Sequence, residues 1–277
     1  MLLALKIVLM IGIVLLGIHL FLTAPNIRRR KVRCPEFLGR DYAHRGLHDG
    51  KNGIPENSLP AFRRAVIRGY GIELDVHLTK DGHLVVFHDR SLKRMCDYDG
   101  DIDSMTLEEI RLQRLADTQQ QIPTLDEVLS LVQGRVPLII EMKSDAKWGD
   151  CALPRALHQR MQTYEGLYCV ESFDPLLLRW YKKHAPGVLR GQLAFDPRVV
   201  KGDYRHVAIF AAAHLMYNFL SRPDFVAYHH QCQKNISYRM VRAIFRPLLV
   251  AWTVRSREEY EALKSQFDLQ IFEAFEP

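Results

Sequence analysis

Acidic, basic and imidazole side chains occur in four short segments of this sequence, each within or directly after a run typical of a β-strand. These segments hold His44 and Arg45, Glu73 and Asp75, His88, and Glu141 and Lys143. Glu73 and Asp75 are two positions apart and so lie on one face of a strand. Two carboxylates pointing into one site cannot both stay ionised without a cation nearby. A hard divalent ion on oxygen ligands, with Glu141 as the third ligand, is therefore expected.

The remaining groups suit the other half of a hydrolytic site. His44 and His88 are placed beside the acids, where imidazoles serve as general acid and general base near neutral pH. Arg45 and Lys143 at the same mouth would bind an anion, and arginine can grip phosphate in bidentate fashion. Together these groups describe metal-assisted phosphoester hydrolysis. The competing interpretation is an exposed acidic pair with ordinary surface charges and surface histidines.

Strands that alternate with helices are expected to position these residues. The predicted strands are Asp41–His44, Gly71–Leu78, Leu138–Met142, Tyr168–Ser172, Leu189–Leu193, Phe225–Tyr228, Leu248–Thr253 and Gln270–Phe275. The predicted helices include Pro60–Arg68, Leu125–Leu131, Leu153–Gln162, Pro175–His184 and Arg257–Lys264. Such βαβ units indicate a parallel sheet, and eight of them fit a closed (β/α)8 TIM barrel, whose active site lies at the carboxyl ends of the strands. The sequence has no GxGxxG or GxxxxGK[ST] motif after the first strand, which argues against a nucleotide-binding fold.

One segment departs from this alternation. Asp81-Gly82 between two β-rich runs predicts a hairpin, so Leu84–His88 should fold back on the second strand. A small insertion follows, at about Ser91–Gln121. Within it, Thr106 and Glu109 form a capping box at a helix start. Thr124 is the expected cap of the helix after the insertion.

The N-terminus is apolar from Met1 to Leu22 except for Lys6 and His19, which is long enough to cross a bilayer as one helix. Basic residues follow this run, so the positive-inside rule predicts an uncleaved, single-pass anchor with its N-terminus outside and the catalytic domain cytoplasmic. A cleaved signal peptide and a helix lying on the membrane surface are the alternatives. Residues 1–33 would be the anchor and its flank, and residues 34–277 the barrel domain.

The net charge belongs to the same segment. The chain has 38 basic and 32 acidic residues, a formal charge of +6, and residues 1–33 contain six basic residues and no acid. The rest is formally neutral, so the charge argues against nucleic acid as a partner and for the contact of the flank with anionic lipid. Five scattered cysteines without a CxxC motif argue against a disulfide framework or zinc module and fit a reducing compartment.

The order of these motifs resembles the glycerophosphodiester phosphodiesterase family. The matching segments are His44-Arg45-Gly46, Pro55-Glu56-Asn57-Ser58, Glu73-Leu74-Asp75-Val76, Thr79-Lys80-Asp81-Gly82, His88-Asp89, Thr106-x-x-Glu109, Ile122-Pro123-Thr124-Leu125, Glu141-Met142-Lys143, Ser172-Phe173-Asp174 and Trp252-Thr253-Val254. The resemblance covers residues 41–254 and implies a TIM barrel with a small insertion after the second strand.

The resemblance also implies roles for single residues. Glu73, Asp75 and Glu141 would hold one Mg²⁺ or Ca²⁺, His44 and His88 would be the catalytic acid and base, and Arg45 and Lys143 would bind the phosphate. Possible secondary contacts are Glu56, Asn57, His77 and Trp252. Asn57 or Ser58 could instead cap the helix at Pro60, and Trp252 could belong to the core. The implied reaction is hydrolysis of a glycerophosphodiester to sn-glycerol 3-phosphate and an alcohol.

Two segments depart from the family pattern. The last strand lacks the usual Thr-Asp-x-Pro ending, and Glu273 could replace its acidic group. The apolar segment His206–Leu220 is expected to be a buried barrel helix, with a membrane-resting surface as the alternative. The latter would favour lipid substrates such as lysophospholipids, through a lysophospholipase-D-type or phospholipase-C-like activity. An inactive glycerophosphodiester-binding module is the non-enzymatic alternative, against which the complete set of site residues argues.

Overall fold

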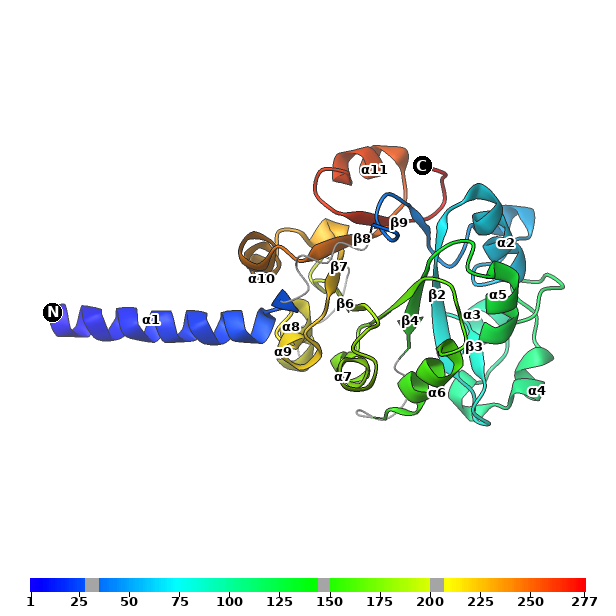
Figure 1. Ribbon diagram of the computed structural model, residues 1–277, viewed down its shortest axis with the longest axis horizontal. Coiled ribbons are helices and arrows are strands. Elements are labelled where there is room, and N and C mark those ends of the chain that lie inside the picture. Colours follow the sequence, from blue (N-terminus) through cyan, green and yellow to red (C-terminus); the bar gives the residue numbers. More distant parts are fainter. Residues whose placement is uncertain (28–34, 144–149, 200–206) are drawn as a thin grey trace.

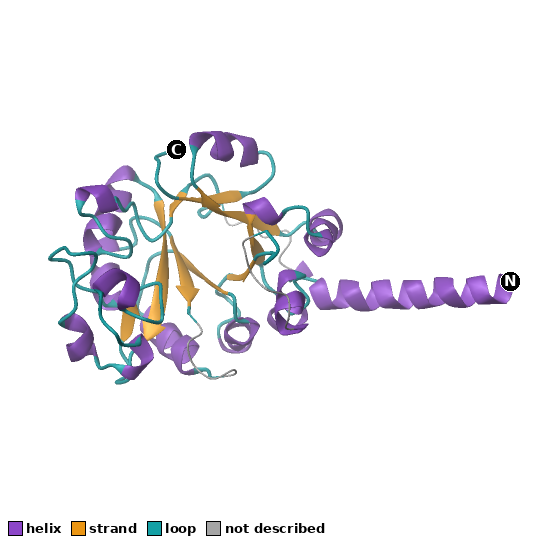
Figure 2. Cartoon of the chain, turned by 180° about the vertical axis from the view of Figure 1, so that it is seen from behind, coloured by secondary structure: helices purple, strands orange, loops and turns teal. Residues whose placement is uncertain are grey.

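The computed structural model describes residues 1–27, 35–143, 150–199 and 207–277, and shows a closed barrel with a long helix projecting from its side (Figures 1 and 2). The barrel strands are β1 (Tyr42–Ala43), β2 (Gly71–Leu78), β4 (Leu138–Met142), β5 (Tyr168–Ser172), β6 (Arg190–Ala194), β7 (Phe225–His229), β8 (Leu248–Val254) and β9 (Leu269–Phe272). They pair in parallel in chain order, and pairing of β1 with both β2 and β9 closes the ring. The predicted TIM barrel is therefore confirmed.

The predicted strand bounds are accurate where a strand is buried on both faces. β2, β4 and β5 begin and end at the predicted residues. The first and last strands are shorter than expected, because only Tyr42 and Ala43 find backbone partners across the closing seam. His44 and Glu273 each follow a strand directly, which is where a barrel carries its functional side chains.

Helices surround the barrel and line the insertion. The α-helices are α1 (Leu2–Thr23), α2 (Leu59–Arg68), α3 (Lys93–Cys96), α4 (Leu107–Arg111), α5 (Leu125–Val132), α6 (Ala152–Met161), α7 (Pro175–His184), α8 (Val207–Ala213), α9 (Asn218–Ser221), α10 (Ile236–Met240) and α11 (Arg257–Leu263). Short 3₁₀ turns cover Gly50–Asn52, Ile102–Ser104 and His230–Cys232, and a π-helical turn covers Val241–Phe245.

Alternation along β2 explains how the barrel separates its core from its site. Ile72, Leu74 and Val76 point outward into the apolar layer beneath the helices. The intervening side chains, Glu73 and Asp75, point into the barrel, since successive residues of a strand face opposite sides. Lower in the barrel the interior is apolar, and includes Tyr42, Ile139, Leu193, Phe225 and Val250. Within β2, the inward carboxylates of Glu73 and Asp75 thus lie above this apolar layer.

The hairpin and insertion form as predicted. β3 (Leu84–Val86) pairs antiparallel with the end of β2. The insertion has a small apolar core of its own, which includes Leu92, Ile102 and Ile110. Thr106 with Glu109 and Thr124 with Glu127 both make complete capping boxes, confirming the two predicted helix starts. The insertion therefore packs as an ordered module beside the strand that carries two of the acids.

Helix α1 is long and apolar enough to cross a membrane, and its apolar window is not buried against the part of the chain that the structure describes. Its last residues behave differently. Asn218 donates from Nδ2 to the Thr23 carbonyl at 2.9 Å. Arg222 donates from Nη1 to the carbonyls of Phe21 and Ala24, at 3.1 and 2.8 Å. The end of α1 is thus fastened to α9. The basic flank that follows it lies outside the described residues.

The segment 206–220 differs from the expected buried barrel helix. His206 lies outside the described residues, and the rest forms two short helices, α8 and α9, separated by a turn. The first turn of α8 is exposed, with Val207, Ile209 and Phe210 facing away from the barrel, whereas Ala213 and Leu215 are buried. The apolar run therefore serves two environments, only one of which is the core.

Candidate active site

Three carboxylates converge at the carboxyl end of the barrel. β2 and β4 pair so that Asp75 stands level with Glu141, and Glu73 lies one inward position below Asp75. One oxygen from each of Glu73, Asp75 and Glu141 lies within 4.8 Å of the others, and all three residues are buried. The predicted acidic triad is therefore assembled in space.

Burial and mutual repulsion disturb the ionisation of these groups. Burial, reinforced by Asp75 and Glu141, raises the pKa of Glu73 well above its usual value. Burial likewise raises the pKa of Glu141 to about 7. Burial opposes ionisation of Asp75 too, but Lys143 and Arg45 outweigh it and hold the pKa of Asp75 low. Buried oxygen donors with this excess of negative charge suit a hard divalent cation, which would allow all three carboxylates to ionise.

The Lys143 ammonium neutralises part of this charge. Its Nζ lies 2.8 Å from Oδ1 of Asp75 and 2.7 Å from Oε1 of Glu141. These two carboxylates raise the pKa of Lys143 despite its burial, so the ammonium stays charged. The structure therefore places the predicted phosphate-binding lysine against the predicted metal ligands.

The turn after β1 brings His44 and Arg45 to the same mouth. The backbone N–H of Arg45 donates to Oε2 of Glu73 at 2.9 Å. Arg45 and Gly46 both have positive φ, +54° and +79°. A Cβ on Gly46 would lie 2.9 Å from the Phe62 ring, so glycine is needed there for space as well as for conformation.

His44 is oriented by a carboxylate from the other end of the chain. Its Nδ1 lies 2.6 Å from Oε2 of Glu273, which follows β9, and its Nε2 lies 4.0 Å from Oε2 of Glu73. Burial lowers the pKa of His44 to about 4, although Glu273 opposes the shift. Glu273 thus occupies the place predicted for a replacement acid, and the nitrogen left facing the acidic triad is Nε2.

His88 is also oriented by a carboxylate that contacts its Nδ1. It follows β3, and its Nδ1 lies 2.6 Å from Oδ1 of Asp89. His77, which points inward from β2, places Nε2 3.1 Å from the His88 carbonyl oxygen. Burial lowers the pKa of His88, against the opposing field of Asp75. His77 therefore supports the backbone of His88 rather than adding a further ligand to the triad.

Arg94, a residue of the insertion, links Glu56 beside Arg45 to Asp89 beside His88. Arg94 in α3 donates from Nη2 to Oε1 of Glu56 at 2.7 Å and from Nε to Oδ2 of Asp89. Glu56 also accepts from Nη1 of Arg45 at 2.8 Å. Burial opposes ionisation of Glu56, but the two arginines lower its pKa. Sequence reasoning missed Arg94, because its spacing from His88 shows no face or register until the insertion is folded.

Asn57 and Ser58 divide the two roles that the sequence left open. Ser58 is the N-cap of α2 and accepts from the Ala61 N–H. Asn57, with φ of +52°, donates from Nδ2 to Oδ2 of Asp75 at 2.7 Å. Asn57 therefore holds a carboxylate of the triad in place, and Ser58 performs the capping.

The other side of the mouth is aromatic and carries one more acid. The Trp252 ring makes edge contacts with Phe173 and His229, at centroid distances of 5.6 and 5.0 Å, and its Nε1 donates to the Ala227 carbonyl. Trp252 thus lines the barrel interior while packing into its wall. Glu171 is level with Glu141 on β5, and burial followed by the field of Glu141 raises its pKa well above normal. The inward register of β5 was the signal that could have revealed Glu171.

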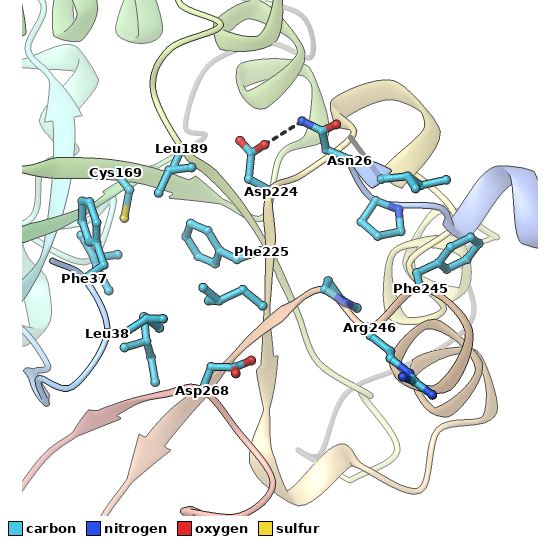
Figure 3. A pocket seen from close by; sticks show the side chains of 16 residues that line it. Asn26, Phe37, Leu38, Cys169, Leu189, Asp224, Phe225, Phe245, Arg246 and Asp268 are labelled. Carbon is cyan, nitrogen blue, oxygen red and sulfur yellow. Dashed lines mark hydrogen bonds between the residues drawn. The ribbon is translucent and has the colours of Figure 1, made fainter. Parts of the chain in front are cut away.

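A cavity at the opposite end of the barrel is separate from this site (Figure 3). Its lining includes Ile139, Phe225, Leu248 and Leu269, each at or next to the beginning of a strand. Asp75 and Glu141 stand toward the other ends of their strands, one inward position beyond the level that Glu73 shares with Ile139. This cavity therefore adjoins the junction with α1, where Asn26 donates to Asp224 at 2.8 Å, and plays no part in the catalytic constellation.

Comparison with known proteins agrees with this geometry. The model of the glycerophosphoryl diester phosphodiesterase family matches residues 44–269. A glycerophosphodiester phosphodiesterase of Caldanaerobacter subterraneus subsp. tengcongensis is 34% identical over 235 residues, covering 80% of this chain and 88% of that protein. The chain belongs to the glycerophosphodiester phosphodiesterase family. It is accordingly an enzyme of the phosphoric diester hydrolase class.

Other relatives and solved structures extend the match. Human glycerophosphodiester phosphodiesterase 1 is 32% identical over 161 residues, or 54% of this chain and 48% of that protein. The Thermotoga maritima glycerophosphodiester phosphodiesterase structure is 27% identical, with a TM-score of 0.63 over 84% of this chain and 94% of that one. An Oleispira antarctica phosphodiesterase, solved with the product sn-glycerol-3-phosphate, shares the fold at 21% identity and a TM-score of 0.68, over 85% of this chain and 93% of that one.

Proposed function

We propose that this phosphodiesterase hydrolyses glycerophosphodiesters to sn-glycerol 3-phosphate and an alcohol in a reaction that depends on a divalent cation. The observation that carries the proposal is the buried triad of Glu73, Asp75 and Glu141, set between two carboxylate-oriented imidazoles. Membership of the family supplies the substrate class. Mg²⁺ and Ca²⁺ both suit the oxygen ligands, and the bound ion would supply Lewis-acid stabilisation of phosphate charge.

In this proposal His44 and His88 share the proton transfers. Each presents Nε2 to the substrate because Nδ1 is held by Glu273 or Asp89. One imidazole takes the proton of the glycerol 2-hydroxyl as its oxygen attacks phosphorus, and the other protonates the departing alkoxide. The resulting cyclic phosphate is opened by water, with the two roles reversed. Both histidines thereby return to their starting protonation states.

The two cations are proposed to bind the phosphate. Arg45 is held by Glu56 at 2.8 Å and lies 3.5 Å from Asp75 through Nε. Lys143 stands between two of the carboxylates. Both side chains therefore border the place where a substrate phosphate would approach the triad. A guanidinium and an ammonium there would offset the negative charge of the phosphodiester through hydrogen bonds and ion pairs.

The proposal is tested by coupled detection of glycerol 3-phosphate from glycerophosphocholine, with and without EDTA. His44→Ala and Glu73→Ala should each abolish turnover, because they remove a proton carrier and a cation ligand. His83→Ala is a matched control, since His83 is exposed at the hairpin turn. Full activity of either site variant, or full activity in EDTA, would overturn the assigned mechanism.

Helix α1 is proposed to be an uncleaved anchor that leaves the barrel on the cytoplasmic side. Its helix runs through Thr23, so cleavage near Ala24 would remove the carbonyl groups that Asn218 and Arg222 bind. A reporter fused after Pro277 should read as cytoplasmic. The measured mass of the mature protein should equal that of the chain with α1 still attached. A reporter signal from outside, or a shortened chain, would contradict the anchor or its orientation.

Lipid substrates are a second possibility, supported by the exposed apolar residues of α8 near the anchor and by the aromatic side of the mouth. A lysophospholipase-D-type or phospholipase-C-like reaction would use the same triad and histidines. A substrate panel comparing glycerophosphocholine and glycerophosphoglycerol with lysophosphatidylcholine separates these activities. Faster release of product from the lysolipid would favour this second function.

A further inference from the structure

Several large, exposed apolar side chains belong to the helical segments α8 and α10 and the π-helical turn after α10, and α8 and α10 are among the barrel helices nearest to α1 (Figure 1). We call this group the α8–α10 face and define it by Val207, Ile209, Phe210, Ile236 and Ile244. Val207 is 85% exposed and Ile236 is 67% exposed, values unusual for such large apolar side chains. Exposed apolar side chains of this kind are typical of a surface that a membrane or a partner protein covers in the cell.

Several contacts place this face against the end of α1. His214, directly after α8, connects this helix to α10, because its Nδ1 lies 2.8 Å from Oγ of Ser237. Phe245, next to Ile244, lines a groove together with Phe21 of α1. Along the axis of α1, which is horizontal in Figure 1, α8, α9 and α10 are the nearest barrel helices, and α2 to α5 are the farthest.

The geometry of α1 then sets where a bilayer would lie. A helix of 22 residues is about 33 Å long, close to the thickness of the hydrocarbon core. Its last turn, which contains Phe21, would therefore reach the interface. Arg222 and Asn218 fasten that turn to α9, and the Arg222 guanidinium also lies 4.8 Å from the centre of the Phe21 ring. With this junction fixed, the barrel cannot swing its α8–α10 face away from the bilayer.

The charge of the same region selects the type of lipid. Between Val207 and Arg257 the sequence contains a single carboxylate, Asp224. Asp224 is buried and paired with Arg190 at 3.1 Å. Arg255 faces Glu273 in the active site and Arg222 holds the end of α1. The other basic residues of this stretch are Lys234, Arg239, Arg242 and Arg246. Apolar side chains within a field of basic ones match an interface rich in anionic headgroups.

We propose that the α8–α10 face is a second membrane-contact surface, which lies in the headgroup region of an anionic bilayer beside the spanning helix. The inference rests on α1 being an uncleaved anchor, but it is independent of the reaction the barrel performs. The apolar side chains enter the interface and the flanking arginines and lysine bind headgroup phosphates. The enzyme is therefore held on the membrane in one orientation rather than tethered loosely.

The test uses the full-length chain in nanodiscs of phosphatidylcholine and phosphatidylglycerol. An environment-sensitive fluorophore is attached to Phe210→Cys, or to Ile67→Cys as the matched control, after Cys34, Cys96 and Cys151 are replaced by serine. Ile67 is 75% exposed on α2, on the side away from α1. Nitroxide-labelled lipid should quench the label at position 210 several-fold more than the label at position 67. Equal quenching at the two positions would overturn the proposal.

A second measurement separates lipid contact from a merely exposed surface. Without phosphatidylglycerol, quenching at position 210 should fall several-fold, and the combined Arg239→Glu and Arg242→Glu variant should show the same fall in the anionic nanodiscs. If quenching at position 210 stays the same without phosphatidylglycerol and in the double arginine variant, the proposed binding to anionic headgroups is wrong. Thermal unfolding reports whether each labelled protein is folded, so neither result depends on hydrolytic activity.

Discussion

The carboxylate of Glu273 lies 2.6 Å from Nδ1 of His44, although the two residues are 229 positions apart in the chain. Closure of the barrel produces this pair, because β9 hydrogen-bonds beside β1 and delivers its following residue to the start of the catalytic turn. The carboxylate stabilises a positive charge on His44 and fixes which nitrogen carries the proton. Burial opposes ionisation of Glu273, but its contact with His44, and then Arg255 at 3.5 Å, lower the pKa of the carboxyl to about 2.

Glu273→Gln should therefore lower kcat by about a hundredfold with little change in KM, because orientation and charge stabilisation of His44 are lost while phosphate binding remains. Glu273→Asp should restore part of the rate. Glu276→Gln is the control, since Glu276 is a more exposed carboxylate that pairs with Arg68. Steady-state kinetics on glycerophosphocholine check the prediction, and an unchanged kcat in Glu273→Gln would show that His44 needs no partner.

Arg94 should act as a positioning residue through Glu56 and Asp89. Arg94→Met removes two charge-assisted contacts and should lower kcat/KM by about tenfold. Arg90→Met is the matched control at the start of the same insertion, where Arg90 pairs with Asp101 and Asp103. Partial rescue by Arg94→Lys and a shifted pH profile would distinguish positioning from folding. Equal losses in both methionine variants would assign the effect to the insertion as a whole.

Divalent cation should stabilise the folded protein by mass action. At a hundred times its Kd, Mg²⁺ or Ca²⁺ should add about 2.7 kcal/mol to the free energy of unfolding relative to EDTA. Glu73→Gln should remove most of that increment, whereas Glu108→Gln, on the exposed side of α4, should keep it. Thermal unfolding in each buffer measures both. An increment that survives in Glu73→Gln would place the ion elsewhere.

His229 should make the fold sensitive to acid. Burial lowers the pKa of His229 from 6.5 to about 4, so the folded protein holds the ring neutral while the unfolded chain protonates it. Its stabilising contribution is complete above pH 6.5 and is lost as the pH falls toward 4. Since the ring keeps some solvent contact, we expect His229→Phe to reduce the loss between neutral and mildly acidic pH by about 1 kcal/mol. Chemical unfolding at both pH values tests this, with His83→Phe as control, and an identical loss in the two variants would refute it.

Much of the fold follows from local pattern, because alternation and capping are local in sequence. The bounds of β2, β4 and β5 and the capping boxes at Thr106 and Thr124 were predictable for this reason. The acidic triad was predictable because parallel strands bring their carboxyl ends to one edge.

The rest of the site depends on where chain segments meet after folding. Arg94 reaches Glu56 only once the insertion has packed, and the pairing of His44 with Glu273 depends on barrel closure. The exposure of α8 was also unpredictable, because an apolar run reads the same whether a core or a bilayer covers it. Composition alone could not decide which side of that segment faces outward.

The hydrogen bonds at the end of α1 have a practical consequence for handling this protein. A form shortened to begin after Thr23 would leave the Asn218 amide, which is buried, without its carbonyl acceptor, and would expose apolar surface at the base of the barrel. Removing α1 to obtain a soluble enzyme would thus lower the stability of the barrel itself. Purification in detergent with α1 intact should yield the more stable protein. Orthologues that lack α1 should carry a different residue in place of Asn218.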